Sequence, residues 1–362
     1  MTTPVSGGGT TMRAVRRIAE GRVELVEFGV PEPGPGQVRL EVLAAGVCHS
    51  DLHVVDTAVG DRWPRPFTLG HEVCGRVTAL GPGADPALLG RQVVVYAPWG
   101  CGVCPRCLQG RVNYCDARRT LPAAGVGLGV DGGMADALVV DAWRLVAADG
   151  LDPGFAAALT DAGLTSFHAV AGSRDRLDVP DAVAVVIGVG GLGHLAIGIL
   201  RELTAAQVIG VDSRPSAVDL ALACGATAAT APDTAGELVR EISKGRGADV
   251  VIDFVGAAAT EELGATLLRT AGDLVIVGSG GGALAMTKPD PLPAGARVSL
   301  PFWGTRPELA QVVELGRGGG LTTQVTAFGL DEAPRVFDAL RARRVVGRAV
   351  LVPASPLSRR SG

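Results

Sequence analysis

Long apolar runs and blocks of like charge are both missing from this 362-residue chain. A membrane-spanning helix needs about 20 consecutive apolar residues, and no such run occurs. The 33 basic and 37 acidic residues give a net charge of −4 and are interspersed, which argues against nucleic acid or a membrane surface as the partner. Charged residues at 19% and hydrophobic residues at 47% are ordinary for a soluble globular enzyme.

The first residues also lack the features of an export signal. Residues 1–11 are small, polar and rich in glycine, without the charged start and apolar middle of a signal peptide. We therefore predict a disordered tail over 1–11, a second short tail from Ser355 onward, and a cytoplasmic location.

The chain is long enough for two domains, and its pattern changes near residue 152. Before that point, short β-branched runs punctuated by proline and glycine predict an antiparallel sheet or barrel, with strands over 13–18, 23–27, 38–45, 73–80 and 92–96. After it, strands alternate with helices, which predicts a parallel sheet covered on both faces. The expected strands are 183–187, 207–211, 250–254 and 274–277, and the expected helices are 155–170, 192–203, 215–224 and 263–270. Beyond these we expect helices 308–316 and 333–341 and a final strand, 348–352.

A glycine-rich turn follows strand 183–187 and opens the next helix. Its spacing is G-x-G-x-x-G, formed by Gly188, Gly190 and Gly193, with Gly191 as a further glycine. The first glycine allows the tight turn, the second lets the backbone approach a pyrophosphate, and the third lets helix and strand pack closely. The N–H groups at the helix start then face the phosphates. A glycine-rich turn without a ligand is the alternative, but the strand before it and the helix after it favour a dinucleotide site.

The next strand, 207–211, ends at Asp212, about 20 residues beyond the turn, as the dinucleotide fingerprint requires. A carboxylate there accepts hydrogen bonds from ribose hydroxyls and repels a 2′-phosphate, so NAD is favoured over NADP. Arg214 is an alternative phosphate ligand, but we interpret it as a solvated surface arginine. Val277 and Gly278 end another strand of the sheet and are predicted to lie near the nicotinamide, because ligands bind at the carboxyl ends of such strands.

Four of the seven cysteines lie in one short stretch. In a reducing compartment, clustered cysteines more often hold metal than form disulfides. Four thiolates suffice for a closed tetrahedral zinc site, which leaves no position for water and therefore predicts a structural role. Isolated thiols and two disulfides are the alternatives. The four residues are Cys101, Cys104, Cys107 and Cys115.

Three short polar segments are weak signals individually, because a single histidine at a strand edge more often makes a local hydrogen bond than binds metal. They are Cys48-His-Ser-Asp-Leu-His53, Gly70-His-Glu72 and Thr160-Asp-Ala-Gly163. Together with the four cysteines and the glycine-rich turn, they occur in the order found in zinc-containing medium-chain alcohol dehydrogenases, which the chain resembles over essentially its whole length between the tails. Segments 160–165 and 301–305 are most similar to bacterial NAD-dependent secondary-alcohol dehydrogenases.

The resemblance implies an α/β fold class with two domains. A GroES-like β-barrel catalytic domain would comprise 12–163 and 303–362, with a structural zinc lobe at about 97–118. A Rossmann domain with a doubly wound parallel sheet would bind NAD and comprise 164–302.

The same resemblance implies that Cys48, His71 and Asp161 bind a catalytic zinc ion, with the fourth position open for water or substrate. Many family members have cysteine where this chain has Asp161, but the bacterial subgroup has aspartate. Asp51 is expected to orient His71, since metal-bound histidines usually donate their other N–H. Glu72 is similar to the family's glutamate beside the zinc; whether it coordinates the metal is left open.

A proton relay is also implied by the resemblance. Ser50 would receive the alcohol proton and pass it through the nicotinamide ribose to His53 and then to solvent. An imidazole suits the last step because histidine titrates near neutral pH. The alternative for His53 is a pocket-lining residue.

The resemblance further assigns His49 and Arg348 to the coenzyme pyrophosphate, as their charge allows, and Thr165 to the nicotinamide. Phe302 and Trp303 are similar to residues of the substrate pocket, although core packing is the alternative in a chain with only 4% aromatic residues.

The expected activity is reversible hydride transfer between an alcohol carbon and NAD, with zinc holding the oxygen and with secondary alcohols and ketones as the preferred small-molecule substrates. Three rivals remain: a polyol or sugar-alcohol dehydrogenase, a reductase of activated C=C bonds, and a non-catalytic zinc- or NAD-binding protein. A homodimer or homotetramer is expected, as in relatives, through edge strands of the Rossmann sheet.

Overall fold

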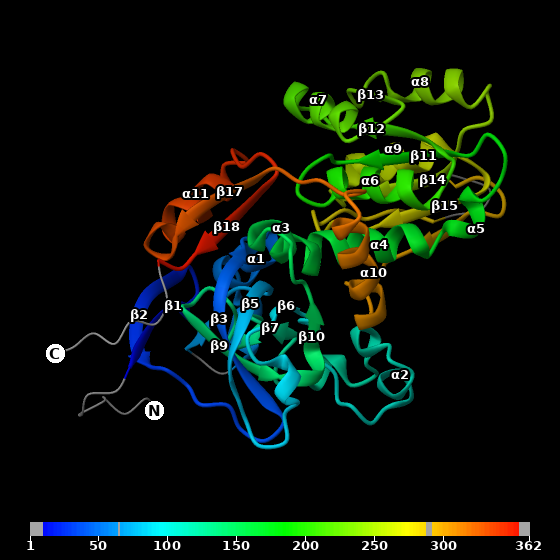
Figure 1. Cartoon of the computed structure of the whole chain (residues 1–362). Helices are drawn as coiled ribbons and strands as arrows, with labels where there is room; N and C mark the ends of the chain where they lie inside the picture. Colours follow the sequence, from blue (N-terminus) through cyan, green and yellow to red (C-terminus); the bar gives the residue numbers. More distant parts are fainter. Residues whose placement is uncertain (1–9, 64–65, 287–291, 355–362) are drawn as a thin grey trace. The chain divides into compact units, whose positions relative to one another are not determined.

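The computed structural model describes residues 10–63, 66–286 and 292–354. It divides into two compact units (Figure 1). The first unit contains 1–161, 305–313 and 324–362, and the second contains 162–304 and 314–323.

The first unit is built on a sheet in the order β10-β6-β5-β3-β18-β17, with β9 also paired to β3. Only β17 and β18 pair in parallel; the other pairs of this sheet are antiparallel, as the proline- and glycine-punctuated pattern predicts. The strands are β3 Gln37–Gly46, β5 Glu72–Leu80, β6 Gln92–Val95, β9 Ala137–Asp141, β10 Leu145–Ala147, β17 Val325–Gly329 and β18 Arg348–Val352.

Smaller elements complete the first unit. A three-stranded sheet has the order β2-β1-β4, and β7 and β8 form a short parallel pair. These strands are β1 Thr11–Ala19, β2 Arg22–Gly29, β4 Phe67–Thr68, β7 Gly125–Val126 and β8 Gly129–Val130. The helices are α1 His49–Asp56, α2 Pro105–Leu108, α3 Pro153–Ala158 and α11 Ala333–Arg341, and α10 Arg306–Arg317 runs from this unit into the second.

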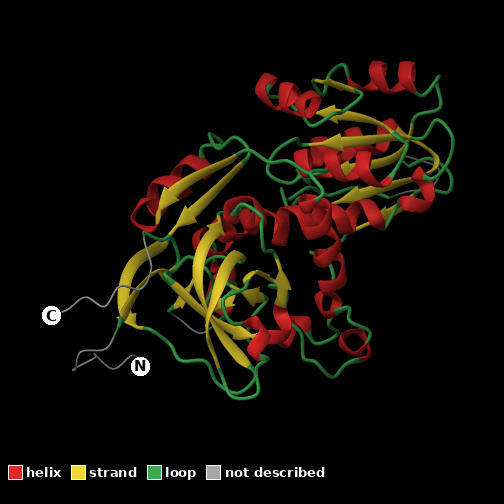
Figure 2. Ribbon diagram, viewed as in Figure 1, coloured by secondary structure: helices red, strands yellow, loops and turns green. Residues whose placement is uncertain are grey.

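The second unit is a six-stranded parallel sheet in the order β13-β12-β11-β14-β15-β16, with helices packed along it (Figure 2). Counted from β11, this is the order 3-2-1-4-5-6, which confirms the Rossmann prediction. Its strands are β11 Val183–Ile187, β12 Gln207–Val211, β13 Ala228–Thr230, β14 Ala248–Asp253, β15 Leu268–Ile276 and β16 Arg297–Ser299. Its helices are α4 Leu164–Ala171, α5 Arg174–Leu177, α6 Gly193–Leu203, α7 Pro215–Ala223, α8 Ala235–Ile242 and α9 Ala258–Leu267.

The core of this sheet explains why its central strands read as unbroken apolar runs. Val183, Val185 and Ile187 of β11 are at most 2% exposed and pack in one cluster with residues of β12, β14 and β15. A strand that is buried on both faces has no solvent-exposed side, so its sequence does not alternate between apolar and polar residues.

Several element predictions differ from the structure. The helix predicted over 155–170 is interrupted by a π-helical turn, Leu159–Gly163. The helix predicted over 263–270 begins earlier, because the Thr260 hydroxyl accepts the Ala257 N–H at 3.0 Å and caps α9 there. Leu268 already belongs to β15, where it pairs with Ala248.

The predicted tails and domain bounds also differ in part. Residues 1–9 and 355–362 lie outside the described residues, but Thr11, placed in the tail by its composition, is the first residue of β1 and pairs with Gly29. Segment 314–323, predicted in the first domain, belongs to the second unit. The Leu321 side chain lies over Gly198 of α6, and Thr323 is hydrogen-bonded to His194 of the same helix.

Helices of the described ranges are all too short or too polar to cross a bilayer.

One buried arginine fixes the end of α1. Arg17 of β1 is 0% exposed and donates from Nε to the Val54 carbonyl (2.8 Å) and from Nη2 to the Asp61 carboxylate (2.7 Å). A cation at the carbonyl end of a helix is favoured by the helix dipole. Gly60 leaves room for this guanidinium, since a Cβ there would lie 2.5 Å from both Arg17 Nε and the Val54 oxygen.

We expect Gly60→Ala to lower the free energy of unfolding by about 2 kcal/mol, because neither the buried guanidinium nor the backbone carbonyl can move away cheaply. The control is Gly236→Ala in α8, where the nearest atom to an added Cβ is the flexible Arg240 Nη1 at 3.5 Å. That variant should be unchanged or more stable by up to about 1 kcal/mol, as alanine is the better helix former. Denaturant titrations followed by circular dichroism compare the two, and equal effects would contradict the assignment.

Candidate metal centres and dinucleotide-binding loop

Four buried side chains from distant parts of the first unit converge on one point: Cys48, His71, Glu72 and Asp161. One ligand atom of each lies within 4.8 Å of those of the others. Cys48 precedes α1, His71 and Glu72 stand at the start of β5, and Asp161 lies in the π-helical turn after α3. Single π-turns inside helices recur at functional sites because the extra residue re-aims a side chain.

The spacing of three of these donors suits a tetrahedral metal. Asp161 Oδ2 lies 3.5 Å from Cys48 Sγ and 3.5 Å from His71 Nε2. Metal–ligand bonds of the lengths usual for zinc separate tetrahedral donors by about 3.4–3.8 Å. A thiolate, an imidazole and a carboxylate are also the donor types that zinc takes in catalytic sites. The residues therefore fit the zinc site that the sequence predicts.

Asp51 organises this cluster from behind. Its Oδ1 lies 3.2 Å from His71 Nδ1, and its Oδ2 accepts the Cys48 N–H at 2.9 Å. The carboxylate is 0% exposed, so both bonds are made out of water. Because Asp51 only accepts, the proton of a neutral His71 sits on Nδ1 and the lone pair of Nε2 is directed toward Asp161. This geometry is compatible with the orienting role predicted for Asp51, which stays a prediction.

The carboxylate of Glu72 forms a buried ion pair with an arginine. Both of its oxygens pair with Arg348 of β18, one of them with Nε at 2.8 Å, and Arg348 Nη2 lies 3.9 Å from Asp161 Oδ2. Arg348 is only 4% exposed. Its predicted contact with the coenzyme pyrophosphate stays a prediction, since the structure pairs this guanidinium with Glu72.

The charges of the cluster favour the metal-binding thiolate of Cys48 but also favour a proton on His71, which a metal ion would have to displace. Burial alone would raise the pKa of Cys48, but the positive charge of Arg348 and the hydrogen bond with His71 lower it. The thiolate is the form that binds metal. Burial alone would lower the pKa of His71, but the carboxylates of Asp51 and Asp161 raise it well above the usual value. A divalent cation among these anionic groups replaces the proton that they would otherwise hold on His71.

Helix α1 carries the predicted relay. Ser50 Oγ lies 3.7 Å from Cys48 Sγ, and His53 follows three residues later on the same face of the helix. Both side chains are exposed in the described structure. Partial burial, with the nearby positive charges of Arg348 and Arg343, lowers the pKa of His49. His49 therefore stands in the electropositive surroundings that its predicted phosphate contact needs.

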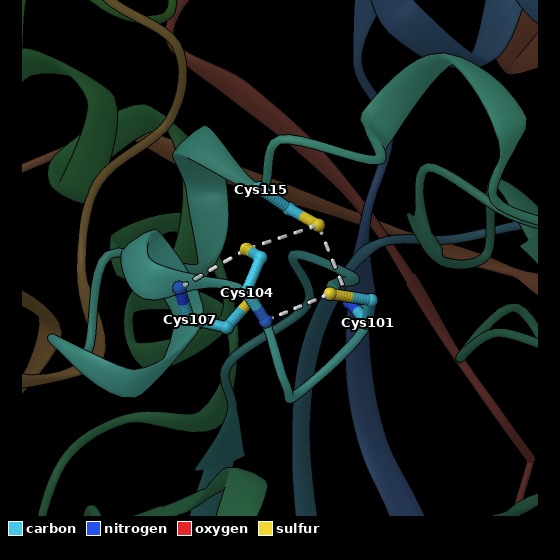
Figure 3. Close-up of side chains that lie close together, drawn as sticks. All are labelled: Cys101, Cys104, Cys107 and Cys115. Atoms are coloured by element: carbon cyan, nitrogen blue, oxygen red, sulfur yellow. Dashed lines mark hydrogen bonds between the residues drawn. The ribbon is translucent and has the colours of Figure 1, made fainter.

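The second metal-ligand cluster is the four-cysteine lobe, whose sulfur atoms turn toward one another in Figure 3. All seven cysteines lie in the described part of the chain and none forms a disulfide. Backbone N–H groups donate to the sulfurs, from Cys101 to Cys115 and from Cys104 to Cys101, each at 3.3 Å. Cys104 and Cys115 are separated by 4.0 Å between sulfurs, close to the spacing of thiolates on one zinc ion.

Backbone donation lowers the pKa of the Cys101 thiol to about 6. Burial and the neighbouring thiols raise that of Cys107 to about 12. Gly100 is needed at the lobe's entry, because a Cβ there would lie 2.8 Å from Cys107 Sγ. The four sulfur atoms are thus arranged so that one cation could bind to all of them. The disulfide alternative has no support, because all four cysteines are free.

The glycine-rich turn lies at the switch point of the parallel sheet, between β11 and β14, where such folds bind nucleotides. Gly188 has φ +86°, and a Cβ on Gly193 would lie 2.1 Å from the Gly188 oxygen. A Cβ on Gly190, by contrast, would meet nothing closer than Arg214 Nη2 at 4.0 Å. Two glycines therefore close the turn, and Gly190 leaves an open approach to the backbone.

Asp212 lies where the adenosine ribose is expected to bind, and it also accepts a hydrogen bond from the glycine-rich turn. Its Oδ2 accepts the Val189 N–H at 2.9 Å. Arg214, predicted as a solvated surface arginine, is 39% exposed and pairs with this carboxylate, with Nε 3.1 Å from Oδ1 and Nη2 3.1 Å from Oδ2. Burial would raise the pKa of Asp212, but the bonds from Arg214 and Val189 hold it below its usual value.

The other predicted residues of the second unit lie at strand or helix ends. Val277 donates its N–H to the Asp253 carbonyl at 2.8 Å, and a Cβ on Gly278 would lie 2.2 Å from the Val255 carbonyl carbon. Thr165, in the first turn of α4, is 7% exposed. Trp303 is 5% exposed and has φ +53°, an uncommon backbone conformation for a bulky residue. Phe302 packs edge-on against it, with ring centroids 5.5 Å apart.

Sequence reasoning missed two residues that these sites use. Asp253, at the end of β14, accepts the Val255 and Gly256 N–H groups at 2.8 and 3.1 Å and so shapes the loop at the switch point. An aspartate at a strand end before glycine is a turn signal that could have revealed it. The other residue is His194, directly after Gly193, since nothing in its apolar sequence surroundings marks the two hydrogen bonds that it makes.

Comparison with known proteins agrees with both units. Residues 34–150 match the family model of the alcohol dehydrogenase GroES-like domain, and residues 191–317 match that of zinc-binding dehydrogenases. An NAD-dependent alcohol dehydrogenase of Sulfolobus acidocaldarius is 33% identical over 91% of this chain and 96% of its own length. A D-arabinose 1-dehydrogenase (NADP(+)) of Saccharolobus solfataricus is 31% identical over 91% of this chain and 95% of its own.

Solved structures agree with the same assignment. The alcohol dehydrogenase of Aeropyrum pernix has a TM-score of 0.86 at 30% identity and covers 94% of this chain and 100% of its own. The acetophenone reductase of Geotrichum candidum, solved with NAD, has a TM-score of 0.81 at 29% identity and covers 96% of this chain and 98% of its own. The chain belongs to the zinc-dependent alcohol dehydrogenase family, with a GroES-like domain and a Rossmann domain.

We predict two zinc ions per chain in the purified protein. Cys104→Ser should leave one and lower the thermal unfolding temperature, because the lobe loses its cross-link. Asp161→Ala should also leave one, with little change in that temperature. Cys224→Ser, outside both clusters, is the control and should keep both ions. Metal analysis by mass spectrometry checks the counts, and a Cys104→Ser protein with unchanged zinc would refute the lobe assignment.

Proposed function

We propose that this protein is an NAD-dependent zinc alcohol dehydrogenase that interconverts secondary alcohols and ketones. The observation that carries the proposal is the buried triangle of Cys48, His71 and Asp161, in which the Asp161 carboxylate lies at metal-ligand spacing from the other two donors. Glu72 of the same cluster is paired with Arg348, so three protein ligands would leave a fourth position for the substrate. A structural zinc site would fill all four positions with protein ligands, as the cysteine lobe does.

Each residue of the triangle has a defined part. Cys48, His71 and Asp161 would hold the metal, and Asp51 would fix the ring of His71. A zinc ion bound there supplies a Lewis acid that polarises the oxygen of the alcohol or ketone. Glu72 is neutralised by Arg348 and stands beside the metal position without being needed as a ligand.

The residues proposed for proton transfer lie on helix α1. Ser50, beside Cys48, would take the hydroxyl proton of the alcohol, and His53, one turn further on, would release it to water. The exposure of His53 suits a group that must exchange protons with solvent.

The residues proposed to bind the coenzyme lie in the second unit. The glycine-rich turn would receive the pyrophosphate and Asp212 the adenosine ribose. NAD then supplies the acceptor for the hydride that leaves the alcohol carbon. Val277, Gly278 and Thr165 remain the proposed contacts of the nicotinamide.

Secondary alcohols are proposed because a relative of very similar structure is an acetophenone reductase, whose named substrate is a ketone. Phe302 and Trp303 would form an apolar wall for such a substrate. The D-arabinose 1-dehydrogenase among the relatives favours a sugar as the second candidate. We also propose that the protein works in the cytoplasm as a homodimer or homotetramer.

The test is NAD-linked turnover on secondary alcohols, primary alcohols, sugars, polyols and enals, with wild type beside Asp161→Asn. We expect oxidation of secondary alcohols by the wild type and loss of at least about a hundredfold in the variant, whose amide is a poor metal ligand. Asp178→Asn, a change in an exposed i,i+4 ion pair, is the matched control and should keep full activity. Turnover only of sugars would select the second candidate, and NADH binding without turnover of any substrate would reject the proposed activity.

We expect Ser50→Ala to lower kcat/KM by about 10²–10⁴, the usual range for losing a positioned proton acceptor. Zinc content should stay at the wild-type value, since Ser50 lies outside both metal-ligand clusters. Steady-state kinetics with metal analysis checks this, and an active Ser50→Ala enzyme would remove Ser50 from the relay.

A further inference from the structure

His194 is a buried histidine that the proposed reaction does not use. It is the second residue of α6, directly after Gly193, and is 1% exposed. Its Nδ1 lies 2.7 Å from the Gly190 carbonyl oxygen, and its Nε2 lies 2.6 Å from Thr323 Oγ1. Both ring nitrogens are therefore engaged, one of them by the glycine-rich turn.

The partners determine the protonation of the ring. A carbonyl only accepts, so Nδ1 carries the hydrogen that Gly190 receives. Nε2 of the neutral ring then accepts from the Thr323 hydroxyl. Burial, which lowers the pKa of His194 against the opposing effect of the Gly190 carbonyl, favours this neutral form.

The bond to Gly190 orients its neighbour. In a planar trans peptide, the carbonyl of one residue and the N–H of the next point in opposite directions. The Gly190 carbonyl is directed to His194, so the Gly191 N–H of the same peptide points away from His194. Glycines have unusual backbone freedom, so such a peptide needs an external hold to keep one orientation.

The turn is held at two places. Asp212 accepts the Val189 N–H at 2.9 Å, and His194 donates to the Gly190 carbonyl at 2.7 Å, so two nearby peptide units each have a buried side-chain partner. The backbone N–H of His194 also reaches the Gly190 oxygen, but at 3.3 Å, which makes the imidazole the closer donor.

We propose that His194 is a positioning residue for the coenzyme: it fixes the Gly190–Gly191 peptide so that its N–H is presented to the pyrophosphate. Thr323 supports this by holding the ring in the tautomer that donates from Nδ1. The inference rests on the proposed NAD binding and adds the residue that orders the phosphate-binding turn.

The experiment measures dissociation constants of NADH, ADP-ribose and adenosine for the zinc-loaded protein and two variants. An asparagine amide reaches the place of Nδ1 and can still donate to Gly190, whereas a glutamine amide reaches the place of Nε2. His194→Gln should weaken NADH and ADP-ribose about tenfold, the effect of losing one buried hydrogen bond. Adenosine, which has no pyrophosphate, should bind as to wild type, and His194→Asn should restore NADH binding to within about twofold.

Fluorescence titration gives the NADH constant, and ligand-observed NMR gives the other two. Wild-type NADH affinity in a folded His194→Gln protein, or equal weakening of adenosine, would overturn the inference, the latter by showing a general structural role. If His194→Gln does not fold, Thr323→Val replaces it: threefold or greater weakening of NADH with unchanged adenosine supports the proposal, and unchanged NADH overturns it. A wild-type protein that binds neither NADH nor ADP-ribose would reject the proposed function, and this inference with it.

Discussion

The register of three strands around Gly46 is the constraint on which the metal centre depends. Gly46, the last residue of β3, pairs with Glu72 of β5 and with Val350 of β18. The first pairing brings Cys48 to His71, although they are far apart along the chain, and the second brings Arg348 to Glu72. Only glycine fits at this point, because a Cβ would lie 1.9 Å from Glu72 Oε2. A one-residue slip in either pairing would turn the ligands to opposite faces of the sheet.

The charges gathered there must balance in a dry interior. Asp51, Glu72 and Asp161 are at most 9% exposed, and isolated carboxylates are costly to bury. Arg348 compensates Glu72, and the His71 ring is hydrogen-bonded to Asp51. Asp51, Cys48 and Asp161 then carry three negative charges, and a divalent cation offsets two of them. The fold thus supplies an anionic site whose charge a metal ion would largely compensate.

Local patterns allowed much of the fold to be predicted from the sequence. Strands 183–187 and 207–211 were predicted with the bounds found in β11 and β12, because apolar runs before glycine and aspartate mark their ends clearly. Helix α8 was missed although its sequence carries the signal, because Leu238, Val239 and Ile242 recur at helical spacing and pack against the core of the sheet. Strand β17 was missed because its stability comes from pairing with β18, which no local pattern records.

The candidate sites also divide into those that local sequence patterns predict and those that they do not. The glycine-rich turn and the four cysteines are compact motifs whose spacing carries the chemistry, and the structure gathers each of them. The grouping of Cys48, His71 and Asp161 came from family resemblance, because no spacing rule joins three separate segments. The pairing of Arg348 with Glu72 was not predicted at all: it depends on strand register, and a charged residue gives no sign of its distant partner.

Asp212 shows how coenzyme choice is tied to backbone order. One carboxylate accepts the Val189 N–H of the glycine-rich turn, holds Arg214, and stands where the ribose hydroxyls are expected. Replacing it to admit a 2′-phosphate would free Arg214 as a phosphate ligand, but it would also release the turn that carries the pyrophosphate. An evolutionary route from NAD to NADP in this chain therefore runs through at least two linked changes, in which a new acceptor for the Val189 N–H must accompany the loss of the acid.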